Sequence, residues 1–220
     1  MSSQSRLFAF LCLLLCFGAA CRPSIFPEDF RTMPGEAGAL LFQDSFEDPT
    51  SQWDRVRQAE GMTDYDGGKY RIYVNDSNAD YWANPGLHFT DVRIEVDAKR
   101  IGGPDNNNFG ILCRYQDMRN FYFFIISSDG YYGIGKVENG RQTLIEPDQM
   151  YPSKFIHQGS ETNHILALCD GSRLTLAVNG EFVAETEDNT FWEGDVGLIA
   201  GSFEEPGVDI IFDNFVVFRP

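Results

Sequence analysis

Short runs of alternating apolar and polar residues, separated by tight-turn dipeptides, constrain this chain more than any other feature. In residues 92–99, apolar side chains occupy every second position and charged side chains stand between them. Residues 70–75 and 173–178 alternate in a similar way. A period of two places successive side chains on opposite faces, so each run predicts a strand with one solvated face. Residues 121–126 are apolar on both faces, which predicts a central strand covered on both sides.

Dipeptides that tolerate a positive φ angle separate these runs. They are Asp129-Gly130, Asn139-Gly140, Asp170-Gly171 and Asn179-Gly180. Such pairs suit hairpin loops because their backbone twist matches the twist of the flanking strands. No segment carries three turns of helical periodicity. The pattern therefore predicts an all-β fold, a β-sandwich of two antiparallel sheets.

The N-terminal segment follows a different pattern and is predicted to be a targeting segment. Arg6 precedes an apolar run over residues 7–20, which is too short to span a bilayer core of about 30 Å. A charged start, an apolar middle and a small-residue end are typical of a signal peptide, here residues 1–20. The small residues before Cys21 resemble a bacterial lipobox, which implies cleavage there and lipidation of Cys21. The alternative is an ordinary signal peptide cleaved near the same point.

The rest of the chain divides into a tether and a domain. Residues 21–38 begin with the lipidated cysteine and contain several prolines and glycines without a sustained period, so they predict a flexible tether. Residues 39–220 are predicted to form the sandwich. We therefore expect an extracytoplasmic lipoprotein of the cell envelope, which touches the membrane through its N-terminal lipid only.

The number and placement of the cysteines agree with an extracytoplasmic lipoprotein. Of five cysteines, two would leave with the signal peptide and Cys21 would take the lipid. Cys113 and Cys169 remain, both in apolar strand-like runs, and an oxidising compartment would allow them to form a disulfide. The alternative is a pair of buried free thiols, since cysteine often behaves as a small core residue.

The charge balance excludes one class of partner. The chain has 17 Lys and Arg against 33 Asp and Glu, a formal net charge of −16. Binding to a phosphate backbone depends on basic patches that release counterions, so no nucleic-acid partner is expected. A polybasic membrane-binding surface is excluded for the same reason.

Several stretches resemble the concanavalin A-like lectin/glucanase superfamily, including bacterial surface lipoproteins and domains labelled 3-keto-disaccharide hydrolase. They are residues 41–46 followed by Trp53, residues 108–115, 120–122 and 128–132, and residues 208–218. The resemblance implies a jelly-roll sandwich of two curved antiparallel sheets, with the first and last strands side by side. This fold hosts several functions. Together with the N-terminal segment, the resemblance implies an envelope-anchored, non-catalytic carbohydrate-binding domain. The alternatives are a glycoside or 3-keto-glycoside hydrolase and an adhesion or structural module without a sugar ligand.

Glu95 and Asp97 are the weak catalytic candidates. Laminarinase-like glucanases carry Glu-x-Asp-x-x-Glu on one strand, and retaining hydrolysis needs two carboxyl groups about 5–5.5 Å apart. Glu95 and Asp97 share a strand face, but Arg100 stands where the third carboxylate belongs. A polar strand face with ion pairs is the alternative interpretation. We therefore expect no catalytic residues.

The predicted ligand-binding set consists of Arg114, Tyr122, Lys136 and Trp82. Sugar rings stack on exposed aromatic rings, and charged or amide side chains meet their hydroxyl groups. Arg114 is expected on the strand face opposite Cys113, among apolar neighbours, where a charge needs a partner or a ligand. These residues predict a glycan or polysaccharide site on a concave sheet face. Core packing is the alternative for its individual members.

No cofactor is expected, apart from one structural calcium ion that the resemblance implies. Many sandwiches of this superfamily bind calcium beside the first and last strands, where Asp44, Glu47 and Asp213 are acidic here. A bulge or strand edge is the alternative role for Asp213. A P-loop, a dinucleotide fingerprint and a Gly-x-Ser-x-Gly motif are absent from the sequence, and the three histidines lack the spacing of a helix-borne zinc site.

Overall fold

A computed structural model of the protein describes residues 38–145 and 148–220. The predicted signal peptide, Cys21 and the predicted tether up to residue 37 lie outside the described residues. Within those two ranges the chain forms strands and turns without any helix, so no helix there could cross a membrane. The predicted all-β fold is confirmed.

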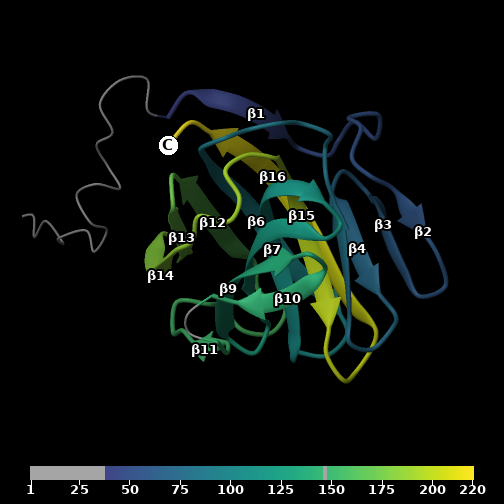
Figure 1. Ribbon diagram of the computed structural model, residues 1–220. Helices are drawn as coiled ribbons and strands as arrows, with labels where there is room; N and C mark the ends of the chain where they lie inside the picture. The colour runs from purple at the N-terminus through teal and green to yellow at the C-terminus, as the bar shows by residue number, and fades with distance from the viewer. Residues whose placement is uncertain (1–37, 146–147) are drawn as a thin grey trace, which may run out of the picture.

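The strands follow one another in chain order, some through tight turns and others through loops of about ten residues (Figure 1). They are β1 (Leu40–Asp44), β2 (Val56–Arg57), β3 (Gly61–Tyr65), β4 (Tyr70–Val74), β5 (Ala79–Ala83), β6 (Val92–Gly102), β7 (Asn107–Asp117), β8 (Asn120–Ile126), β9 (Tyr131–Glu138), β10 (Arg141–Leu144), β11 (Tyr151–Pro152), β12 (Asn163–Asp170), β13 (Arg173–Val178), β14 (Glu181–Glu187), β15 (Asp195–Ser202) and β16 (Val208–Phe218).

The strands form two antiparallel sheets. The nine-stranded sheet has the order β14-β13-β12-β6-β16-β4-β3-β2, and β1 also pairs with β16. The seven-stranded sheet has the order β10-β9-β8-β7-β15-β5, and β11 also pairs with β9. The first and last strands therefore lie side by side, as Figure 1 shows and as the resemblance implied.

The main core lies between the two sheets. The apolar positions of the alternating runs in β4 and β6 are fully buried there, including Ile72 and Ile94. Every second residue of β8 faces the same core, including Tyr122 and Phe124. At one end, the ring of Trp53 packs edge-on against Phe215, with ring centroids 5.0 Å apart. Such aromatic contacts add to the free energy of area burial.

The predicted disulfide is present and joins the two sheets. Cys113 lies on β7 of the seven-stranded sheet and Cys169 on β12 of the nine-stranded sheet. The two strands are not hydrogen-bonded neighbours, so the bridge crosses the core. With a sequence separation of 56 residues, it stabilises the fold by about 4 kcal/mol through the unfolded chain.

Candidate binding groove on the seven-stranded sheet

The outer face of the seven-stranded sheet, which points away from the main core, is unusually apolar. Its buried side chains are Leu112, Phe121, Phe123, Ile125, Val137 and Ile199. These residues form a cluster separate from the main core, with Trp82, Tyr115, Leu144 and Met150 packed against it. The cluster is therefore a second, smaller core, and its partly exposed cover, such as Trp82, is the part that a ligand could reach.

Two hollows open on this face beside β5. The lining of the smaller hollow includes Asp80, Trp82, Phe123 and Gln142. The larger hollow continues from Asp80 and Trp82 toward Gln58. Because the two hollows share Asp80 and Trp82, we treat them as one site and call it the β5 groove.

Tilted ring contacts position the aromatic wall of the β5 groove. The partly exposed indole of Trp82 lies 5.4 Å from the buried ring of Phe121, between centroids. Tyr115 also lies 5.4 Å from Phe121. The indole nitrogen of Trp82 donates to the Tyr115 hydroxyl at 3.4 Å. These contacts fix the indole against the cluster, where it stays partly exposed.

Polar groups occupy the floor of the groove. The Nδ2 atom of Asn108 donates to Oδ1 of Asp80 at 3.1 Å. Gly201 pairs with both residues from β15, and a Cβ atom there would collide with the Asp80 carboxylate and the Asn108 amide. Burial raises the pKa of Asp80, and hydrogen bonds from Asn108 and Gln142 only partly oppose this rise. Gly201 thus makes room for a carboxylate that faces a partly apolar hollow.

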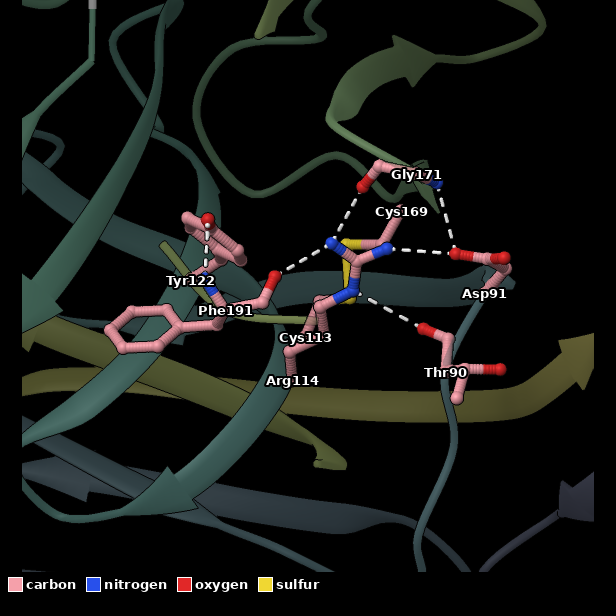
Figure 2. Close-up of a disulfide and its surroundings, with 8 residues drawn as sticks. All are labelled: Thr90, Asp91, Cys113, Arg114, Tyr122, Cys169, Gly171 and Phe191. Atoms are coloured by element: carbon pink, nitrogen blue, oxygen red, sulfur yellow. Dashed lines mark hydrogen bonds and ion pairs between the residues drawn. A yellow bond between two sulfur atoms is a disulfide. The ribbon is translucent and has the colours of Figure 1, made fainter. Parts of the chain in front are cut away.

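The structure does not bring the four predicted binding residues together. Trp82 alone lines the β5 groove. Arg114 is buried, which corrects the expectation that it lies on an open face opposite Cys113. Its φ angle is +52°, and the pairing of β7 with β8 shifts register after Cys113. This bulge breaks the alternation and turns Arg114 toward the disulfide, as Figure 2 shows.

Arg114 instead ties three chain segments together (Figure 2). Its guanidinium donates to the carbonyl oxygens of Thr90 at 3.2 Å, Gly171 at 2.8 Å and Phe191 at 2.8 Å. It also forms an ion pair with Asp91 at 2.9 Å. A buried charge needs such partners, and here the protein supplies all of them.

Tyr122 and Lys136 line neither hollow of the β5 groove, so they do not converge there with Trp82. The Tyr122 hydroxyl donates to Oδ1 of Asp188 at 2.6 Å. The Lys136 ammonium donates to Oδ2 of Asp188 at 2.8 Å and to Thr190 at 2.6 Å. Burial of Asp188 opposes its ionisation, but these hydrogen bonds prevail and lower its pKa to about 2. The network fastens the segment after β14 to the seven-stranded sheet.

Glu95 and Asp97 lie on the outer face of the nine-stranded sheet, where they hold a histidine that sequence reasoning missed. His164 Nε2 is 3.2 Å from Glu95 and its Nδ1 is 2.8 Å from Asp97. These hydrogen bonds, with Glu95 contributing most, raise the pKa of His164 to about 9 against the effect of burial. The remaining oxygens meet Arg93 and Asn214, both at 2.9 Å, so every carboxylate oxygen is engaged.

Two of the three predicted calcium ligands, Asp44 and Asp213, accept hydrogen bonds or an ion pair from donors of the protein. Asp44 accepts the Phe46 backbone N–H at 2.7 Å and the Trp53 indole N–H at 3.0 Å. Asp213 forms an ion pair with Lys69. Among residues 38–145 and 148–220, no three His, Cys, Asp or Glu side chains are grouped to hold a metal ion, so Asp44, Glu47 and Asp213 do not form such a group. The calcium ion remains a prediction.

Comparison with known proteins identifies the fold. No protein-family model matches the chain, and no curated protein sequence matches it. Among solved structures, the carbohydrate binding module CBM66 from Bacillus subtilis has a TM-score of 0.63 at 19% identity, over 76% of this chain and 96% of that one. A Bacillus subtilis protein of unknown function with a galectin-like fold has a TM-score of 0.63 at 11% identity, over 83% and 97%.

A third similar structure is an enzyme. The catalytic domain of an endo-1,3-beta-glucanase (laminarinase) from Thermotoga petrophila RKU-1 has a TM-score of 0.58 at 10% identity, over 84% of this chain and 99% of that one. These likenesses define the chain as a galectin-like or concanavalin A-like jelly-roll sandwich. One fold thus hosts both binding and catalysis, and the function has to be argued from the site.

Proposed function

We propose that the protein is an envelope-anchored lipoprotein whose sandwich binds glycans at the β5 groove without hydrolysing them. One observation carries the proposal. A partly exposed tryptophan, Trp82, stands beside a carboxylate, Asp80, and an amide, Gln142, in a hollow on an apolar sheet face. An indole face suits the C–H face of a sugar ring, and the carboxylate and amide suit its hydroxyl groups.

Two of the similar structures support a sugar ligand, since one is a carbohydrate binding module and another a laminarinase. The non-catalytic choice rests on Glu95 and Asp97. Their carboxylates lie on the other sheet from the β5 groove, and His164 binds both. Hydrolysis of a glycosidic bond needs two carboxyl groups that flank the same bond, with one free to donate a proton.

Affinity gel electrophoresis of the purified protein through bacterial-envelope and plant polysaccharides, with and without calcium, tests this proposal. We expect retardation by at least one polysaccharide, and at least a tenfold loss of affinity in Trp82→Ala. Trp192→Ala is the matched control, because Trp192 is exposed but lines neither hollow of the groove. Absence of any retardation, or equal retardation of Trp82→Ala, would overturn the proposal.

The glycoside or 3-keto-glycoside hydrolase stays an alternative that the same material can test. Incubation of the protein with each retained glycan, followed by reducing-end analysis, should release no products. If products appear and Glu95→Gln or Asp97→Asn lowers turnover by orders of magnitude, the hydrolase is correct. Selective capture of another protein in the absence of any glycan ligand would favour the interaction module.

A further inference from the structure

We propose that the β5 groove selects uncharged sugar rings and rejects glycans that carry carboxylate or sulfate groups at the bound unit. The inference rests on the proposed glycan-binding function and adds the chemical class of ligand. The charged residues that line and surround the two hollows support it.

The floor of the groove offers acceptors to hydroxyl groups. An ionised carboxylate has about four lone-pair sites and no donor, and Asn108 and Gln142 each use one site on Asp80. The remaining capacity of Asp80 fits the O–H donors of a sugar ring. Gln142 offers both a donor and an acceptor beside it. A carboxylate or sulfate on the ligand would place its acceptor oxygens against the acceptor oxygens of Asp80, with no proton to share between them.

The described residues that line the smaller hollow supply no cation to compensate. Among the described residues that line the smaller hollow, Asp80 alone carries a formal charge. The larger hollow adds Asp54 and Arg55. The Arg55 guanidinium lies with Nε 2.6 Å from Oδ1 of buried Asp64, but Arg57 pairs with the same carboxylate, so one carboxylate serves two arginines. At the larger hollow an anionic ring would meet Asp80 and Asp54 beside Arg55, whereas at the smaller hollow it would meet Asp80 alone, in a protein of net charge −16.

Arg119 places a cation at the rim of the smaller hollow. Its side chain lies beside Gly140, which lines that hollow, and its Nη2 atom donates to the Asn139 carbonyl at 2.8 Å. An anionic substituent that docked at the rim would use Arg119, whereas a neutral ring on the floor would not. The variant Arg119→Gln therefore separates these two modes of binding.

A glycan array that includes neutral, uronate-bearing and sulfated glycans, followed by isothermal titration of the retained glycans, tests the inference. We expect the retained glycans to be neutral, with uronate or sulfate derivatives of the same backbone at least tenfold weaker. Asp80→Asn should weaken neutral ligands about tenfold, because hydrogen bonds to an ionised acceptor are the stronger ones. It should also narrow the difference between neutral and anionic ligands, while Arg119→Gln changes neither.

The outcomes distinguish a failure of glycan binding from a failure of the selectivity for uncharged rings. If no glycan binds, the proposed function itself fails. If uronate or sulfated glycans bind as tightly as neutral ones, or if Arg119→Gln abolishes binding, glycan binding stands and the selectivity is wrong. Glu161→Gln, at an exposed carboxylate that lines neither hollow, controls for net charge. If Asp80→Asn fails to fold, Gln142→Ala tests the same floor and should weaken neutral ligands.

Discussion

The structural role of Arg114 leads to a quantitative prediction for Arg114→Met. Methionine retains an unbranched apolar stem but removes every donor of the guanidinium. The Phe191 carbonyl is buried and would lose its donor, at a cost of about 1–3 kcal/mol. The Thr90 and Gly171 carbonyls are partly buried and can recruit water, so each costs about 0.5–1 kcal/mol. Asp91 is about half exposed and adds little.

The expected loss for Arg114→Met is therefore about 2–5 kcal/mol in the free energy of unfolding. Urea unfolding followed by tryptophan fluorescence measures it, as a lower midpoint with an unchanged slope. Arg119→Met is the matched control, because the Arg119 side chain bonds at the surface, and it should change stability by less than about 0.5 kcal/mol. While the variant stays folded, its affinity for a glycan should equal that of the wild type. A loss below about 0.5 kcal/mol, or a selective loss of glycan binding, would refute the reasoning.

Three further predictions follow from the other sites. Because the pKa of His164 is raised to about 9, its stabilising effect is complete below about pH 6.5 and declines as the pH rises through 9. The melting temperature should fall over that window, whereas His164→Gln should flatten the profile. Replacing Cys113 and Cys169 together by alanine should cost about 4 kcal/mol in urea unfolding, and an unchanged midpoint would contradict the role of the bridge. Cys21→Ser should abolish incorporation of a labelled fatty acid in cells, and continued labelling would contradict lipidation at that residue.

Sequence patterns predicted the sandwich well because they report local geometry. Alternation identified the buried positions of β4 and β6, and the turn dipeptides adopt the positive φ angles that hairpins need, as at Asn179 and Gly180. The apolar run of residues 121–126 is indeed buried on both faces. Its outer cover comes from side chains such as Trp82 on the same sheet.

The sites were harder to predict because they depend on bulges and on long-range register. Period-two reasoning assumes a regular strand, and one bulge placed Arg114 inside instead of outside. His164 faces Asp97 only through the pairing of β12 with β6, across 67 residues of sequence. The position of Asp80 can be predicted locally, since Asp80 lies on the same strand face as Trp82 and on the face opposite buried Ala83. The room for its carboxylate, however, depends on Gly201 of the distant strand β15.

The central claim is that the β5 groove holds a sugar ring on Trp82. A crystal structure of the protein with an oligosaccharide from the best retained polysaccharide tests it most directly. The account predicts a ring stacked on the Trp82 indole, with ring hydroxyls within hydrogen-bond distance of Asp80 and Gln142. A sugar bound instead at Trp192, or on the outer face of the nine-stranded sheet around Glu95, would contradict it.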